Sequence, residues 1–340
     1  MKSIRRICAV LTVMVLFGAG LLKLMDPVGA SLVAGEYFNF LGLSFMAPLA
    51  MAVGVGMALL ETVLGAGLIT GVWPRLVAAA SGVVLGGFTV LTLVMWIVNP
   101  AMDCGCFGEA VHLTHKQSFL KNVVLCVLWA VACLPFRSIR KPLKVKYVSF
   151  WVATVSVAAF SVWAILNIPP MDFTPLKPGA MLMQAEQTPS EDAPLLSICD
   201  ASGEYRDELL ARGAFLLVSV YDPDALPKEL EGEIYALSES LRGSGITPLV
   251  LRSYGESENV QSFNSDRRTL LTLNRSNGGA TLLSDGIVIA KWSRRDYPSP
   301  ASLQDLLSQD PTDAVLKENT PKRLKLQGFL LYVFAVLLLL

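Results

Sequence analysis

The sequence predicts an α-helical polytopic membrane bundle followed by an α/β domain outside the membrane. Of the 340 residues, 53% are hydrophobic and only 16% are charged, whereas ordinary soluble domains are roughly a quarter charged. The long apolar runs lie before residue 170, and alternating strand and helix patterns follow them. The formal net charge is zero, so the charge balance does not favour nucleic acid as a partner.

Five apolar segments predict membrane-spanning helices, because a span needs roughly 20 apolar residues. They are Ile7–Leu24, Pro48–Val72, Leu76–Val98, Phe119–Phe136 and Val148–Leu166. Membrane lipid is therefore an expected partner. The apolar residues 326–340 are short for a span and follow the basic string PKRLK, so a sixth transmembrane helix stays an open question.

Short basic loops predict the orientation, since Lys and Arg collect on the cytoplasmic side of a membrane. Residues 25–47, residues 99–118 and everything after Leu166 are then expected outside the cytoplasm, as in a protein of the bacterial inner membrane. Lys23 and Asp26 follow the first segment, which favours a retained helix over a cleaved signal peptide. The basic residues are Lys2, Arg5, Arg6, Arg75, Arg137, Arg140, Lys141, Lys144 and Lys146.

A proline-rich linker from Ile168 leads into the second part of the chain, where strand and helix patterns alternate. A polar, weakly helical stretch is expected at Glu256–Leu273, and Asp285-Gly286 is typical of a hairpin turn. This order predicts an α/β domain with a mixed sheet. The expected strands and helices are Ala214–Tyr221, Leu226–Gly243, Ile246–Ser253, the hairpin Ala280–Ser293 and Ser299–Gln309.

These patterns predict four regions along the chain. Residues 1–146 form a four-helix membrane domain, and residues 147–169 form the fifth helix with its linker. Residues 170–322 form the soluble domain, and residues 323–340 hold the undecided sixth helix.

The string DCGCFG in the outward loop places Cys104 and Cys106 on either side of one glycine. Disulfides form in the compartment outside a bacterial cytoplasm. A bridge across one residue is strained, and strained bridges exchange readily. His112 or Lys116 could raise the thiolate fraction of a nearby cysteine. We therefore expect Cys104 and Cys106 to be the catalytic pair of a thiol–disulfide exchange or electron-transfer reaction.

Two other interpretations of this loop stay open. Cys104, Cys106, His112 and His115 form a Cys₂His₂ set that could bind a metal, although structural zinc fingers space their cysteines more widely. The pair could also be a static bridge, but so short a loop gains little stability from one.

Glu61 lies in the middle of the second apolar segment, where an ionisable group is costly and often functional. It could handle protons or contact a quinone, which makes quinone a candidate cofactor. The plain alternative is a protonated glutamate hydrogen-bonded to a neighbouring helix.

The strings GLLKLMDP, MWIVNP and above all DCGCFG, together with Glu61, resemble the DoxX/MauE-like membrane proteins over about 150 residues. The resemblance implies a four-helix bundle linked to electron transfer or disulfide chemistry outside the cytoplasm. The MauE branch is tied to the maturation of methylamine dehydrogenase, and the cysteine pair would correspond to Cys104 and Cys106. The resemblance thus implies an envelope client protein or a redox partner.

The soluble part resembles a thioredoxin fold, on its element order and the string DGIVIAKW. A thioredoxin has Cys-x-x-Cys after its first core strand, but this chain reads VSVYDPDALPKEL there. The domain is therefore expected to bind or position a client instead of reacting with it. Cys199 is expected to be a small buried residue, with a resolving thiol as the alternative. A non-catalytic assembly factor is accordingly a second hypothesis for the whole chain.

The predicted topology can be tested with protease. Protease added to intact spheroplasts should cut within residues 214–309, because the basic loops hold the other side of the membrane in the cytoplasm. A domain that is cut only after permeabilisation would contradict this orientation.

Overall fold

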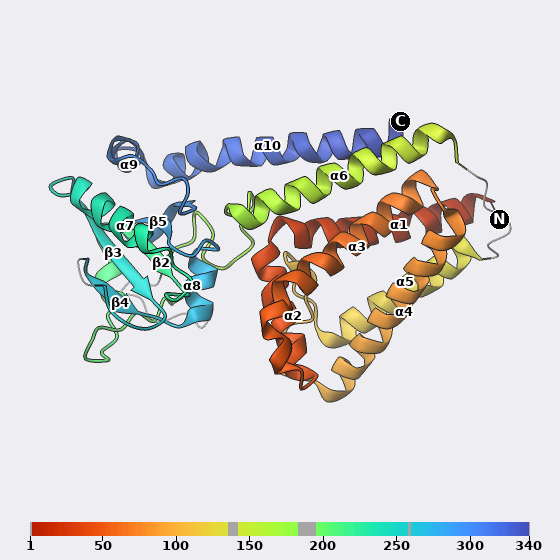
Figure 1. The fold of residues 1–340 in the computed structure, drawn as a ribbon, viewed down its shortest axis with the longest axis horizontal. Helices are drawn as coiled ribbons and strands as arrows, with labels where there is room; N and C mark the ends of the chain where they lie inside the picture. Colours follow the sequence, from red (N-terminus) through yellow and green to blue (C-terminus); the bar gives the residue numbers. More distant parts are fainter. Residues whose placement is uncertain (1, 135–141, 183–194, 258–259, 340) are drawn as a thin grey trace. The chain divides into compact units, whose positions relative to one another are not determined.

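The computed structural model describes residues 2–134, 142–182, 195–257 and 260–339 (Figure 1). The chain divides into two compact units. Unit 1 comprises Met1–Ile165 and Leu326–Leu340, and unit 2 comprises Leu166–Lys325. The basic residues Arg137, Arg140 and Lys141, which contributed to the predicted orientation, lie outside the described residues.

Unit 1 is a bundle of helices, and helices at all five predicted spans are confirmed. Each is long and apolar enough to cross a membrane, the second with its preceding 3₁₀ turn η1 (Ser44–Leu49). Many of their outward-facing side chains are apolar and exposed, as expected for surfaces that meet lipid. The five are α1 (Lys2–Met25), α3 (Ala50–Thr70), α4 (Pro74–Val98), α5 (His115–Cys133) and α6 (Lys144–Leu166).

Unit 1 also contains a shorter helix, α2 (Pro27–Phe40), between the first two spans. The sequence analysis did not predict this helix. It starts where the Asp26 carboxylate accepts a hydrogen bond from the backbone N–H of Gly29. Pro27 occupies the first helical turn, where its missing N–H costs nothing. With 14 residues, α2 is too short to register as a span.

Glycines allow the helices of unit 1 to pack closely. A Cβ atom on Gly65 of α3 would lie 2.7 Å from the Cβ of Phe17 on α1, and one on Gly54 would lie 2.6 Å from the carbonyl oxygen of Ala30 on α2. Small residues at helix contacts let backbones approach in the absence of water. Helices α1, α2 and α3 thus form a tight core against which α4 and α5 pack (Figure 1).

The apolar end of the chain belongs to α10 (Pro311–Leu339), whose residues from Leu326 onward are part of unit 1. Phe329 stacks on Phe160 of α6, and the Ser149 hydroxyl donates a hydrogen bond to the carbonyl of Val336. Among the described residues, α10 is not one of the five helices that meet the length and hydropathy of a span. This part of α10 therefore packs along a spanning helix (Figure 1).

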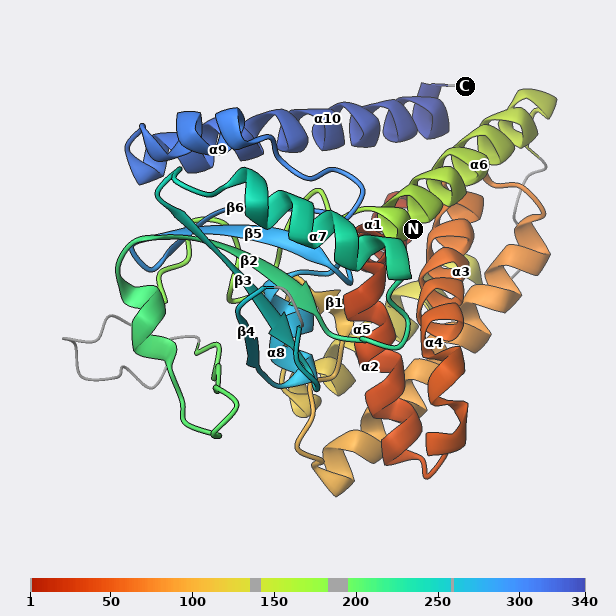
Figure 2. The ribbon, with the colours of Figure 1, turned by 60° about the vertical axis from the view of Figure 1, so that its left-hand side comes forward.

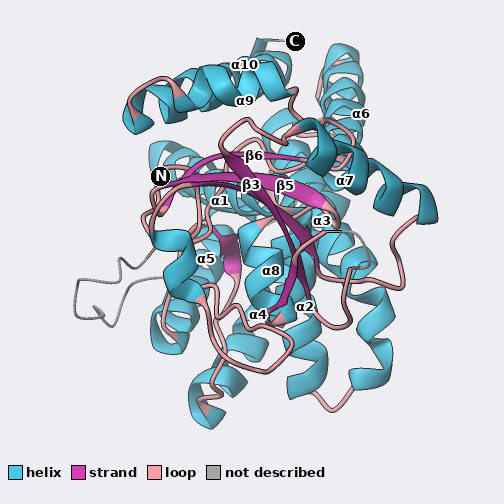
Figure 3. Ribbon diagram, turned by 90° about the vertical axis from the view of Figure 1, so that its left-hand side faces the viewer, coloured by secondary structure: helices cyan, strands magenta, loops and turns pink. Residues whose placement is uncertain are grey.

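Unit 2 contains the predicted mixed sheet, with the strand order β4-β3-β2-β5-β6 (Figures 2 and 3). The pairs β2–β3 and β3–β4 are parallel, whereas β2–β5 and β5–β6 are antiparallel. The hairpin turn is confirmed, since Asp285 and Gly286 both have positive φ. The strands are β2 (Ala214–Val220), β3 (Ile246–Arg252), β4 (Ser262–Asn264), β5 (Gly279–Ser284) and β6 (Ile287–Trp292).

Helices cover both faces of this sheet. Leu216 and Val218 of β2 face α7 (Lys228–Ser240) and α9 (Pro300–Leu307) on one side. Leu217, between them, faces α8 (Arg267–Leu273) and the 3₁₀ turn η3 (Asp207–Ala211) on the other. Successive side chains of β2 thus point to opposite faces of the sheet, and both faces are covered, as in a strand buried on both sides.

The prediction of a weakly helical stretch at Glu256–Leu273 is wrong for most of the residues that the structure describes there. Residues Ser262–Asn264 form β4 along the edge of β3. Only Arg267–Leu273 is helical, and it begins where the Asp266 carboxylate accepts hydrogen bonds from the N–H groups of Arg268 and Thr269. The pairing with β3 is a tertiary contact that local composition does not encode.

The Asn274 side chain fastens the ends of β5 and β6 and offers a test of the sheet. It is fully buried and donates to the carbonyls of Ala280 and Trp292 at 3.0 and 3.1 Å. Asn274→Ala should lower the unfolding free energy of unit 2 by about 3 kcal/mol, because buried carbonyls lose their donors. Pulse proteolysis of the full chain in urea would measure this.

The exposed amide Gln304 on α9 provides the control. Gln304→Ala should change the stability by no more than about 0.5 kcal/mol. Equal effects of the two variants would contradict the assigned role of Asn274.

Candidate functional site

The cysteine loop is anchored at both ends by helix caps. Asn99 ends α4 in the left-handed conformation, with its N–H bonded to the carbonyl of Met95. Thr114 starts α5 in a reciprocal capping box with Gln117. Between them, Cys106 opens the short strand β1 (Cys106–Glu109). Because both ends are capped, the two cysteines have defined positions at the end of the bundle.

Gly105 sets the path of this loop. Its φ is +58°, which favours glycine, and a Cβ there would lie 2.3 Å from Cγ1 of Val33 on α2. On the same helix, the Tyr37 hydroxyl donates a hydrogen bond of 2.7 Å to the carbonyl of Cys104. Burial raises the pKa of Tyr37, so this phenol stays a donor. The unpredicted helix α2 therefore forms one wall of the site.

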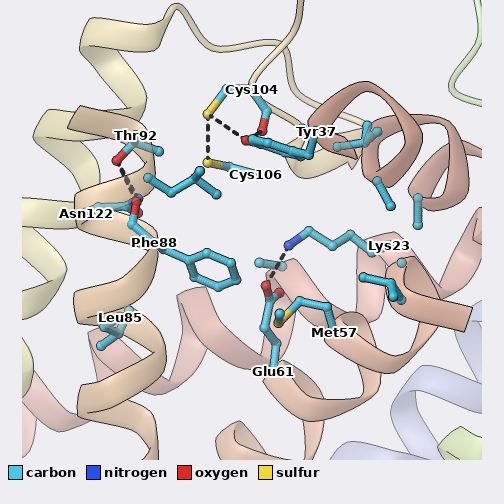
Figure 4. A pocket seen from close by; sticks show the side chains of 18 of the residues that line it. Lys23, Tyr37, Met57, Glu61, Leu85, Phe88, Thr92, Cys104, Cys106 and Asn122 are labelled. Atoms are coloured by element: carbon cyan, nitrogen blue, oxygen red, sulfur yellow. Dashed lines mark hydrogen bonds and ion pairs between the residues drawn. The ribbon is translucent and has the colours of Figure 1, made fainter. Parts of the chain in front are cut away.

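The two thiols are close together and unequal. Their Sγ atoms are unbridged and lie 3.3 Å apart (Figure 4). Cys104 is only 2% exposed, whereas Cys106 is half-buried. The Cys104 thiol donates a hydrogen bond that lowers the pKa of Cys106 to about 5. The same hydrogen bond, together with burial, raises the pKa of Cys104. The pair thus holds one thiolate and one thiol at neutral pH.

The surroundings of the two thiols differ from the predicted ones. Cys104 is buried because Gly105 lets the chain pack against α2. His112 and Lys116 were the predicted activating groups. After the Cys104 thiol, the positive charge that favours the Cys106 thiolate is that of Lys121 on α5.

The metal-binding interpretation is not supported by the positions of the histidines. His112 Nδ1 lies 3.1 Å from the Asp103 carboxylate, and His115 lies against Asn99 and the carbonyl of Met102. Among the described residues, no three His, Cys, Asp or Glu side chains form a group that could hold a metal ion. The structure therefore does not bring the four predicted ligands together.

Glu61 pairs with Lys23 across two helices. The Lys23 ammonium on α1 lies 2.6 Å from Oε1 of Glu61 on α3, and Glu61 is 2% exposed. Glu61 is therefore bonded to a neighbouring helix, as the plain alternative expected, and its partner is the basic side chain of Lys23. Such a pair inside a membrane bundle is stable only if each charge keeps its partner.

An apolar cavity of about 300 Å³ joins the thiol pair to this ion pair. Figure 4 shows the cysteines on one side of the space and Lys23 with Glu61 on the other, with the ring of Phe88 extending toward the ion pair. The cavity wall combines residues of five helices with the cysteine loop. No motif in the sequence pointed to Tyr37 or Lys121, because their relation to the thiols is tertiary.

The remaining cysteines have ordinary surroundings. The apolar neighbours of Cys8, Cys126 and Cys133 predict buried side chains; Cys8 and Cys133 are buried in α1 and α5, whereas Cys126 of α5 is only half-buried. Cys199 of unit 2 is half-buried, not fully buried as expected, and its thiol donates to the carbonyl of Asn264 at 3.4 Å. Its backbone bridges to Tyr205 and Asn264, which holds the thiol in unit 2.

Comparison with known proteins concerns the first part of the chain. Residues 1–135 match the family model of methylamine utilisation protein MauE. The match includes α1 to α5 and the whole cysteine loop, so the predicted resemblance to MauE is confirmed over those residues. No curated protein and no solved structure matches the chain. The thioredoxin-like character of unit 2 stays a prediction.

The unequal thiols lead to a pH test. Alkylation of Cys106 by iodoacetamide should keep a nearly constant rate between roughly pH 6 and pH 8, and fall as the pH drops through about 5. The reason is that only the thiolate reacts, and its pKa is depressed. Peptide mass spectrometry of the fully reduced protein would follow each site.

Cys104→Ala removes the donated hydrogen bond and is the matched variant. Its Cys106 profile should move toward the ordinary thiol pKa of about 8.5. An unchanged midpoint in this variant would show that Cys104 does not stabilise the thiolate.

Proposed function

We propose that this protein is a membrane thiol–disulfide oxidoreductase in which Cys106 exchanges with a client and Cys104 closes the bridge. The observation that supports it most is the asymmetric pair: a half-buried thiolate with a fully buried thiol 3.3 Å away. A thiolate is the reactive form of cysteine, and its partner is positioned to displace whatever Cys106 has bound.

The thiolate of Cys106 also favours one direction of the reaction. Stabilising the reduced state of a cysteine pair makes its disulfide a stronger oxidant. The bridged pair would therefore accept electrons from client thiols. A client thiolate attacks Sγ of Cys106, and Cys104 leaves and takes a proton from the second client thiol. The client thiolate formed in this way attacks the client sulfur of the mixed disulfide, so that the client gains one S–S bond and Cys106 leaves as the thiolate.

We place this reaction outside the cytoplasm of a bacterium, in its inner membrane, where client disulfides persist. The basic loops support this orientation. The Arg5 guanidinium donates to the carbonyls of Ala132 and Leu134, so the start of α1 and the end of α5 lie on one side. The thiol loop joins α4 to α5 at the opposite end of α5.

Unit 2 supplies a module that holds the client. Its strand pairing, parallel on one side of β2 and antiparallel on the other, supports a thioredoxin-like fold. The turn from β2 to α7 contains no cysteine, so exchange is left to unit 1. The match of residues 1–135 to MauE is compatible with a client matured in the envelope, such as a disulfide-rich enzyme.

The exchange can be tested with single-cysteine variants of the purified full chain. Cys104→Ser keeps a hydroxyl donor beside Cys106, so it should form a stable mixed disulfide with glutathione disulfide. Cys106→Ser leaves only the buried thiol and should react at least about tenfold more slowly. Intact-protein mass spectrometry would score both.

His112→Ala is the matched control, because its imidazole pairs with Asp103 and does not contact the thiols. It should leave the exchange rate within about twofold of the unchanged protein. Faster reaction at Cys104 than at Cys106 would refute the assigned roles.

A further inference from the structure

The cavity beneath the thiols has the character of a ligand site. Its volume of about 300 Å³ is at the lower end of the range for small-molecule pockets. Its wall is mainly aliphatic, with Phe88 presenting an aromatic ring (Figure 4). Polar groups line it around the thiols and at Lys23 with Glu61, and Asn122 donates a hydrogen bond to Thr92 on a further part of the wall.

The ion pair has an unused hydrogen-bonding atom. Lys23 contacts Oε1 of Glu61, but Oε2 is buried and has no hydrogen-bond partner among the described residues. A buried carboxylate oxygen without a donor is costly. Within the cavity that both residues line, Oε2 can therefore accept a hydrogen bond from a hydroxyl group of a ligand, and the Lys23 ammonium can donate one to a ligand carbonyl.

The proposed reaction at the thiols indicates what kind of ligand the cavity would hold. Each client oxidised at Cys106 leaves two electrons on the cysteine pair, which needs an acceptor to re-form its bridge. A nucleotide cofactor fits poorly, because its phosphates would lie among aliphatic walls. A quinone has an apolar ring with carbonyl oxygens on opposite edges. Its two acceptors match a cavity with polar groups on two sides.

We propose that this cavity binds a lipid-soluble quinone, which accepts the two electrons of the Cys104–Cys106 pair. One carbonyl oxygen accepts a hydrogen bond from Lys23, and the ring lies against Phe88, toward whose face the Lys23 ammonium also points at 5.5 Å. The other carbonyl faces the thiol side, where Lys121 lines the wall. This inference rests on the proposed function, since it supplies the oxidant for that cycle.

The electron transfer balances with groups in the wall. The Cys106 thiolate and the Cys104 thiol form one Sγ–Sγ bond, and the S–H bond of Cys104 breaks. Their two electrons reduce the quinone to the quinol. Cys104 supplies one of the two protons, and the Lys23 ammonium supplies the other and regains it from solvent. Lys23 and Glu61 act on the quinone and not on the client.

Decylubiquinone is a suitable probe for the purified, reduced full chain under anaerobic conditions. One equivalent should be reduced per cysteine pair, seen as loss of quinone absorbance and of alkylatable Cys104 and Cys106. The Cys104→Ser, Cys106→Ser double variant should still bind the probe in equilibrium dialysis but not reduce it. Binding without reduction by the unchanged protein would overturn the electron-transfer step.

Neighbouring residues on α4 provide a matched pair of variants. Leu91 lines the cavity, whereas the adjacent Val90 is exposed on the outer face. Leu91→Trp should fill the site and weaken binding by at least about tenfold, while Val90→Trp should leave it unchanged. The Lys23→Met, Glu61→Gln double variant avoids an unpaired charge and should lower affinity by a similar factor. Equal binding by all these variants would overturn the proposed site.

Two further probes distinguish a quinone site from an acyl-chain groove, and a failure of the quinone proposal from a failure of the proposed exchange reaction. Decylbenzene has the same tail and no carbonyl, so displacement of the quinone by it with equal affinity would reveal an acyl-chain groove only. Glutathione disulfide tests the thiols in the same sample. A pair that exchanges with it but neither binds nor reduces decylubiquinone would refute the quinone site and leave the proposed function standing. Failure of both reactions would refute both proposals.

Discussion

The ion pair between the Lys23 ammonium and the Glu61 carboxylate lies inside the membrane unit, and the packing of the helices around the site depends on it. Lys23 and Glu61 join α1 to α3 at 2.6 Å on the wall of a mainly apolar cavity. Removing either partner would strand a buried charge, which costs several kcal/mol. The helices that contribute the pair must therefore approach closely, and glycines such as Gly65 of α3 permit it. A pair of this kind makes the cavity polar at one end.

The thiol pair makes the other end of the cavity polar, and it does so from a loop and not from the helices. Cys104 and Cys106 come from a loop, not from a helix, and Gly105 lets that loop pack against Val33. The result is a buried thiol donating to a half-buried one. Two cysteines separated by one residue in the sequence thereby acquire opposite pKa shifts. Their inequality, more than their proximity, is what suits them to successive steps of an exchange reaction.

The two units divide the work in the proposed reaction. Unit 1 has the thiols, the ion pair and the cavity, and it contains the residues that match the MauE family. Unit 2 has a sheet with helices on both faces, and its interior is held by contacts such as those of Asn274. Its single cysteine, Cys199, lies outside the turn between β2 and α7. In the proposed reaction, unit 2 binds the client and the exchange itself takes place in unit 1.

The sequence by itself predicted the five long membrane helices and the hairpin and most strands of unit 2, and it singled out Cys104, Cys106 and Glu61 as candidate functional residues. These features depend on apolar length, on the period of a pattern or on a rare residue type in an unusual place, all of which are local. Only the tertiary structure decided the rest. Helix α2 and strand β4 were missed because each depends on a cap or a partner strand as much as on composition. Lys23, Tyr37 and Lys121 lie far apart in the sequence, and their pairing with Glu61 and the thiols exists only after α1, α2, α3 and α5 pack. Burial and pKa are properties of that packing, so the roles of Cys104 and Cys106 could be distinguished only in the folded chain.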